Sequence, residues 1–157
     1  MSAMRFKIEH RIGVQRPVEQ VWAAIYDLAA WKDWNPMYPE ASGRLLISAP
    51  LTLTEKIGDA TETYQAIVGD WVPHAQIVWV RKSHNGLLRH VRYLEIEKLS
   101  EEGCIFSNGE IYEGLLAGLL VSRRRRRETR QAFIGLGEAV KARTEAGHGE
   151  DIEAWRR

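Results

Sequence analysis

The feature that most constrains the fold is a run of six strand-like segments joined by very short turns. The segments span residues 43–48, 51–56, 62–71, 75–82, 88–99 and 104–113. Turn-forming residues separate them, as at Gly58-Asp59 and Asn85-Gly86. Because connections this short close hairpins, the sequence predicts an antiparallel sheet.

Another strand and a pair of short helices precede this run. In residues 5–15, apolar side chains alternate with mostly polar ones, which predicts a strand with one buried face. Pro17 then suits the first turn of a helix, and a second short helix over 29–34 ends at Asn35-Pro36. The first helix carries an apolar stripe at helical spacing, made of Val18, Val21, Trp22, Ile25 and Leu28.

After Gly114 the apolar period changes to that of a helix, which we expect to run from residue 115 to near Gly147. One stripe of this helix holds Leu115, Leu119, Ser122, Arg126, Thr129, Phe133, Leu136 and Val140. A sheet with one apolar face needs a cover, and this helix can supply it. We therefore expect a single α+β domain over residues 1–147, followed by a mobile polar tail over 148–157.

Composition narrows the possible functions. The formal net charge of +1 over 157 residues is too balanced for a protein that mainly grips phosphate backbones, so no nucleic-acid partner is expected. Cys104 is the only cysteine, which excludes an internal disulfide and a cysteine-based metal cage. The longest apolar stretch, 115–121, is too short to span a bilayer. A cytoplasmic protein without stable membrane insertion is expected.

Several segments resemble the SRPBCC superfamily, which includes START domains, birch-pollen-allergen-like proteins and polyketide cyclase/dehydrase-like proteins. The quoted matches are RPVEQVWAAIYDLAAWKDWNP, VPHAQIVWV, EEGCIFSNGEIYEG and FIGLGEAVKARTE. The resemblance covers residues 5–146. It implies a helix-grip fold, in which a seven-stranded antiparallel sheet wraps around the C-terminal helix, with two short helices after the first strand. It also implies a pocket between sheet and helix for a hydrophobic small molecule that is lipid-, quinone- or polyketide-like.

Strand alternation then predicts which side chains face that pocket. His90 and Arg92 share a face with Leu94 and Ile96, while the resemblance turns the Glu110 side of the last strand inward. Since buried charge needs a partner, Arg92 or His90 is expected to face Glu110. The residues expected to contact ligand are Trp22, Trp34, Trp79, His90, Arg92, Asn108, Glu110, Tyr112, Arg126 and Thr129. The alternative is that the polar members only satisfy one another.

Three functions remain open. The first is binding or transport of a hydrophobic small molecule, and the second is a cyclase or dehydratase in which His90 or Glu110 moves protons. The third and least favoured is an interaction module that binds nucleic acid or protein through the arginines. The common motifs for phosphate, zinc or serine-hydrolase chemistry do not occur in the sequence, so no cofactor and no metal are expected. The resemblance implies that Trp31 and Trp34 lie at the entrance of the pocket.

Five consecutive arginines, Arg123 to Arg127, begin the last helix. Five helical residues turn through about 400°, so the run cannot be a one-sided basic stripe. Arg124 is expected to pair with Glu128 at helical spacing. Arg126 lies on the inward stripe and is expected either to hold the anionic or carbonyl end of a ligand, together with Thr129, or to cover apolar surface with its stem.

Overall fold

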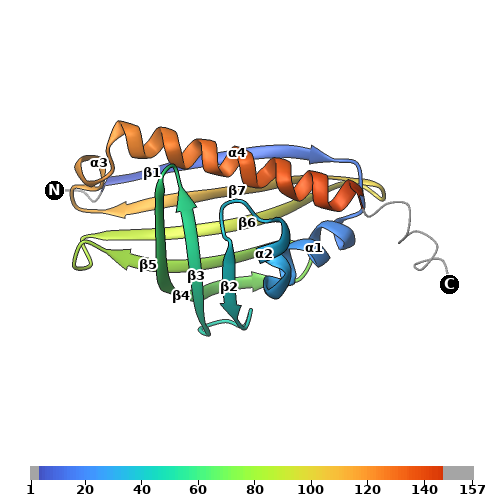
Figure 1. Ribbon diagram of the computed structural model, residues 1–157, viewed down its shortest axis with the longest axis horizontal. Helices are drawn as coiled ribbons and strands as arrows, with labels where there is room; N and C mark the ends of the chain where they lie inside the picture. Colours follow the sequence, from blue (N-terminus) through green and yellow to red (C-terminus); the bar gives the residue numbers. More distant parts are fainter. Residues whose placement is uncertain (1–3, 147–157) are drawn as a thin grey trace.

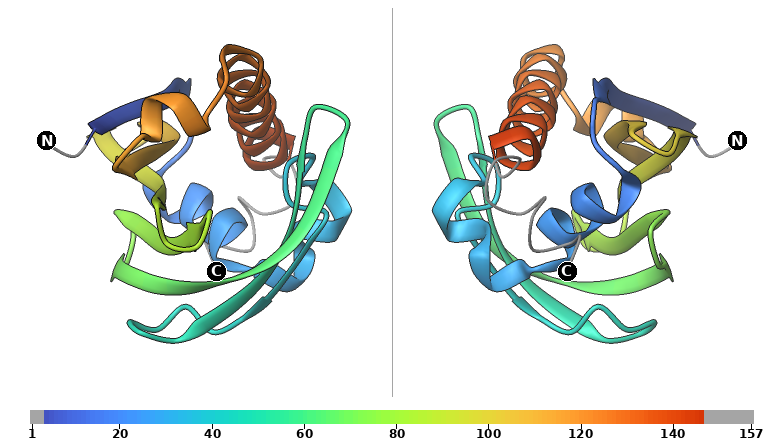
Figure 2. Two further views of the ribbon diagram at one scale, coloured as in Figure 1. Left: turned by 90° about the vertical axis from the view of Figure 1, so that its left-hand side faces the viewer. Right: turned by 90° about the vertical axis from the view of Figure 1, so that its right-hand side faces the viewer.

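The computed structural model describes residues 4–146, which form a seven-stranded antiparallel sheet curved around one long helix (Figure 1). The strand order is β1-β7-β6-β5-β4-β3-β2. Figure 2 shows the sheet bent into a U, with the long helix α4 across its open side. The predicted α+β helix-grip arrangement is therefore confirmed, whereas the predicted tail over 148–157 lies outside the described residues.

Except for one short helix after the last strand, the elements follow the chain in the order that the sequence predicts. They are β1 (Met4–Val14), α1 (Val18–Tyr26), the 3-10 turn η1 (Leu28–Ala30), α2 (Trp31–Trp34), β2 (Glu40–Gly43), β3 (Pro50–Ile57), β4 (Ala60–Val72), β5 (Gln76–Ser83), β6 (Leu88–Ser100), β7 (Gly103–Gly114), α3 (Ala117–Leu120) and α4 (Arg123–Ala146). The predicted stripe of α1 is buried, from Val18 to Leu28 in the following turn.

The strand expected over 43–48 is wrong in its position. The observed strand β2 is Glu40–Gly43, and it pairs with β3. Gly43 has a φ of 126°, and a side chain there would collide with the Pro50 carbonyl oxygen. The strand therefore ends at the glycine with which the prediction began it.

The long helix also begins later than predicted. Residues 117–120 form the separate short helix α3, which ends at Val121 in extended backbone. The Ser122 hydroxyl then accepts a hydrogen bond of 3.1 Å from the Arg125 backbone N–H, and so caps α4. Leu115 and Leu119 are exposed rather than part of the core stripe, which begins at Thr129 and continues through Phe133 to Val140.

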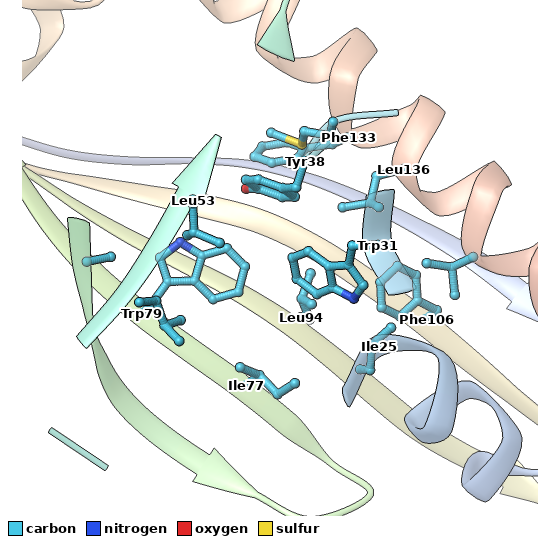
Figure 3. Close-up of a cluster of buried hydrophobic side chains, with 14 of the residues drawn as sticks. Ile25, Trp31, Tyr38, Leu53, Ile77, Trp79, Leu94, Phe106, Phe133 and Leu136 are labelled. Atoms are coloured by element: carbon cyan, nitrogen blue, oxygen red, sulfur yellow. The ribbon is translucent and has the colours of Figure 1, made fainter. Parts of the chain in front are cut away.

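Aromatic side chains fill the middle of the space between the sheet and α4 (Figure 3). The ring centroids of Trp31, Tyr38 and Trp79 lie 5.5 to 6.4 Å from one another. Phe106 and Phe133 are fully buried beside them. The second short helix thus places Trp31 in the core rather than at an entrance, and this part of the interior is packed.

Candidate functional site

A pocket of about 180 Å³ opens at one end of the interior. This end lies on the left in Figure 1, the end at which α3, the start of α4 and the β5–β6 hairpin are found. The residues that line the pocket are Glu62, Arg81, Ser83, His84, Leu88, His90, Arg92, Glu110, Tyr112, Leu120, Val121 and Arg125. Most of these side chains are polar, in contrast to the aromatic core beside them.

Strand register explains why polar side chains gather here. Arg92 of β6 lies between Trp79 of β5 and Glu110 of β7. The next inward row of the sheet places His90 between Arg81 and Tyr112. Alternate residues share a face of a strand, so the polar residues at 90, 92 and 110 all point inward. The predicted inward faces of β6 and β7 are confirmed by burial.

Arg92 is the centre of a buried ionic network and is 3% exposed. Its guanidinium donates to Glu110, to Glu55 and to the hydroxyl of Tyr38. Tyr64 adds a hydrogen bond of 2.7 Å from its hydroxyl to Oε2 of Glu55. A buried guanidinium with two carboxylates satisfies the requirement that buried charges be paired. The predicted facing of Arg92 and Glu110 is therefore confirmed.

His90 joins the same network on its other side. Its Nδ1 lies 2.5 Å from Oε1 of Glu110. Burial alone would raise the pKa of Glu110, but the charge of Arg92 and the hydrogen bond from His90 outweigh it and lower the pKa to about 2. At neutral pH Glu110 is therefore ionised and can only accept hydrogen bonds. The proton between Glu110 and His90 consequently lies on Nδ1 of His90. Nε2, the other ring nitrogen, faces Ser83 at 2.7 Å from its Oγ.

Two further arginines border the pocket. The guanidinium of Arg81 lies 4.0 Å from the ring centroid of Tyr64 and donates to Glu62 at 3.1 Å. Arg125 approaches Oε1 of Glu55 at 3.8 Å, and a third of its side chain is exposed. Burial raises the pKa of Tyr64. The pocket thus combines cationic groups, a neutral phenol and an imidazole held by a carboxylate.

Among the ten residues that we expected to contact ligand, the structure brings His90, Arg92, Glu110 and Tyr112 together in this pocket. Trp79 packs in the aromatic core. On the first two helices, Trp22 packs against Tyr26 and His74, and Trp34 packs at the edge of the core. The side-chain amide of Asn108 donates a hydrogen bond of 3.0 Å to the Phe133 carbonyl. Thr129 is fully buried.

Arg126 does not line the pocket, although it lies on the predicted inward side. Its guanidinium donates to the carbonyls of Val121 and Gly118 and lies 4.0 Å from the ring centroid of Phe6. It therefore links α3 and β1 to the start of α4. The neighbouring Arg125 is the arginine of the run that reaches the pocket. The predicted pair of Arg124 and Glu128 is confirmed at 2.8 Å.

Four residues of the network were missed in the sequence, among them Tyr64, which shares the inward face of β4 with Ala66 and Val68. Glu55 shares the inward face of β3 with Leu51, Leu53 and Ile57, so the alternation could have revealed it. Ser83 continues the inward face of β5 by the same rule. Tyr38 lies in the connection after α2, where no periodicity indicates its direction.

Two features are absent from residues 4–146, a group of metal ligands and a helix that could cross a membrane. No group of three or more histidine, cysteine, aspartate or glutamate side chains in this range could hold a metal ion. Likewise, none of the helices described there combines the length and the apolar character that crossing a bilayer requires. Cys104 is buried, and its burial raises the pKa of the thiol, in line with a core side chain.

Comparison with known proteins finds similarity in structure. No family model and no curated protein matches the sequence. An aromatase/cyclase from Streptomyces superposes with a TM-score of 0.72 at 16% identity, over 92% of this chain and 96% of that one. A START superfamily protein from Mycobacterium smegmatis superposes with a TM-score of 0.70 at 14% sequence identity, over 89% of this chain and 97% of that one. A norcoclaurine synthase from Thalictrum superposes with a TM-score of 0.69 at 11% sequence identity, over 93% of this chain and 98% of that one.

Proposed function

The chain has an SRPBCC-type helix-grip fold, and on this premise we propose that it is an enzyme that transfers protons on a small carbonyl compound, as a polyketide cyclase or dehydratase does. The observation that carries the proposal is the pair of His90 and Glu110 at the pocket. A carboxylate that holds the proton on one imidazole nitrogen leaves a lone pair on the other, which can act as base and then, once protonated, as acid. The similarity to an aromatase/cyclase supports this choice.

The size of the pocket limits the substrate. A cavity of about 180 Å³ is close to the ~150 Å³ that holds a benzene-sized molecule and smaller than the ~300 Å³ at which pockets for drug-sized ligands begin. Leu88, Leu120 and Val121 offer an apolar wall, and the arginines offer donors to an oxygen. We therefore favour a short ketone, and we place transport of a larger hydrophobic molecule second, because the aromatic core occupies the space that it would need.

The proposed reaction is the loss of water from a β-hydroxyketone. Nε2 of His90 takes the proton from the carbon beside the carbonyl, and Arg81 or Arg125 stabilises the enolate oxygen. The imidazolium then gives this proton to the departing hydroxyl, which leaves as water. The product is a conjugated enone, and His90 returns to its starting form.

Dehydration of diacetone alcohol, followed by the ultraviolet absorbance of the enone, tests this proposal. His90→Ala and Glu110→Gln should lower the rate by about 10²- to 10⁴-fold, while His74→Ala, at an exposed position away from the pocket, should leave it unchanged. Ser83→Ala should retain activity, because the imidazole is the base. A wild-type protein that binds an unreactive ketone in calorimetry but dehydrates no short β-hydroxyketone would instead support a carrier and overturn the enzyme.

A further inference from the structure

We infer that Ser83, His90 and Glu110 form a nucleophilic triad that transfers the acyl group of a short ester or thioester. The sequence does not predict this triad, because the usual serine-hydrolase motif is absent. Such triads are recognised by geometry and by the role of each group rather than by order in the chain. This reaction goes beyond the proposed function, since it forms a covalent bond and needs no proton transfer at carbon.

The distances are those of a hydrogen-bonded triad. Ser83 Oγ lies 2.7 Å from Nε2 of His90, and Nδ1 of His90 lies 2.5 Å from Oε1 of Glu110. Both contacts fall in the range in which a nucleophile meets its base and the base meets its orienting group. All three side chains line the same pocket.

The direction of each hydrogen bond follows from the charge of Glu110. As an ionised acceptor held by Arg92, Glu110 fixes the proton of His90 on Nδ1. Nε2 then carries a lone pair and accepts the proton of the Ser83 hydroxyl. The exposed His84, whose Nδ1 lies 3.0 Å from the same hydroxyl oxygen, must consequently donate to it. The arrangement is that of a serine polarised by a base.

The backbone keeps Ser83 in this place. Ser83 is the last residue of β5 and pairs with Leu88, the first residue of β6. A tight turn joins the two strands, closed by a hydrogen bond of 3.1 Å from the Gly86 N–H to the Ser83 carbonyl. His84, Asn85 and Gly86 all have positive φ, 55°, 57° and 86°, and the chain reverses within the four residues between Ser83 and Leu88. His90 therefore follows in β6 at a fixed distance from Ser83.

The acyl transfer balances with water as the only co-reactant. Ser83 Oγ attacks the acyl carbon while its proton passes to Nε2 of His90, and an oxyanion forms. The bond to the alcohol or thiol then breaks, and this leaving group takes the proton from His90. Water attacks the acyl-serine, gives one proton to His90, and releases the carboxylic acid. Ser83 recovers its proton from His90.

Cationic side chains border the position where the oxyanion would form. Arg81 and Arg125 line the pocket together with Ser83. Guanidinium groups donate two hydrogen bonds to a single anionic group and remain charged at all working pH values. They can take the part that backbone N–H groups take in other acyl transferases. The small volume of the pocket restricts the acyl group to a few carbon atoms.

Covalent labelling tests the triad directly. We would treat the full chain with para-nitrophenyl acetate and with a small alkyl fluorophosphonate, follow the release of nitrophenolate, and map the modified residue by peptide mass spectrometry. Modification is expected on Ser83. Ser83→Ala should abolish it, and His90→Ala should slow it by at least about 10²-fold. Ser42→Ala, at an exposed position on β2, should label like the wild type.

The outcome is independent of the dehydration assay. Lack of label on Ser83 in the folded wild type with both probes, or unchanged nitrophenolate release in Ser83→Ala, would overturn the triad. In that case, dehydration of diacetone alcohol by the wild type would still support the proposed function. If dehydration is absent while Ser83 is labelled through His90, the triad stands and the proposed function fails.

Discussion

The two ends of the interior are built on the same three strands and differ in what holds them together. Along β5, the inward side chains pass from Ile77 and Trp79 to Arg81 and Ser83. β6 and β7 make the same change, from Leu94 to Arg92 and from Phe106 to Glu110. One end is an aromatic core and the other an ionic network.

This difference sets how each end responds to change. Apolar contacts in a core are non-directional, and neighbouring side chains can relax partly into a space left by a smaller residue. An ionic network has defined partners, and loss of one of them leaves a charge buried without compensation. We therefore expect graded losses at the aromatic end and a concerted loss at the polar end. Such a network is also where groups with shifted pKa values, and hence chemistry, are found.

The largest effect is expected for Arg92→Ala. Two buried carboxylates, Glu55 and Glu110, would lose the guanidinium that they share. We expect the free energy of unfolding to fall by about 4 to 5 kcal/mol, the upper end of the range for a broken buried ion pair, as measured by urea denaturation. The triple change with Glu55→Gln and Glu110→Gln should recover part of the loss. A loss below about 1 kcal/mol would show that the network adds nothing to stability.

Trp79→Ala tests the aromatic end. The side chain is 1% exposed and packs against Trp31 and Tyr38. Removing it should lower the free energy of unfolding by about 3 to 4 kcal/mol, because a cavity remains. The same denaturation experiment at several pH values should show a nearly constant loss, and Trp79→Phe should lose less. A loss that varied strongly with pH would mean that the two ends are not separable.

Glu110→Gln should show the pH dependence that Trp79→Ala lacks. The pKa of Glu110 is lowered from 4.5 to about 2, so its ionised form stabilises the fold above pH 4.5, and this contribution disappears as the pH falls toward 2. The stability difference between wild type and Glu110→Gln should be about 3 kcal/mol at neutral pH and should shrink over that acid range.

Nuclear magnetic resonance titration of the carboxyl groups checks the assignment in Glu110→Gln. The carboxyl resonance that titrates near pH 2 in the wild type should be missing from the variant. A difference in stability that stayed constant from neutral pH down to pH 2 would contradict the lowered pKa. Glu113→Gln serves as the matched control, since Glu113 is a partly exposed residue of the same strand.

Most of the fold could be predicted because its strands and helices have periodic patterns of apolar residues. Strand alternation and short turns predicted the sheet and correctly turned His90 and Arg92 inward, and the family resemblance correctly turned Glu110 inward. The predicted start of the long helix was wrong because Leu115 and Leu119 continue the apolar spacing across a break in the helix. The break occurs because the Ser122 hydroxyl caps α4 and the backbone at Val121 is extended. Both are local features that apolar spacing does not reveal.

The site was only partly predictable because it depends on distances between strands. Ser83 and His90 are separated by a turn whose geometry brings Oγ to Nε2, and a pattern of residue types does not contain that distance. The middle of the interior is also occupied by side chains that the sequence did not place there, Trp31 of α2 and Tyr38 of the connection that follows it. Connections have no period, so their side-chain directions are not readable in advance.

The smallest expected effect separates two neighbouring arginines of the basic run. Arg126 holds two carbonyls and covers Phe6, so Arg126→Ala should lower stability by about 1 kcal/mol, a decrease in Tm of about 2 to 4 °C. Arg125→Ala removes a partly exposed and long ion pair and should change stability by less than about 0.5 kcal/mol. Thermal denaturation followed by circular dichroism measures both. If Arg125→Ala were the more destabilising change, Arg126 would not be the residue that fixes α3 to α4, and the mouth of the pocket would depend on the ionic network instead.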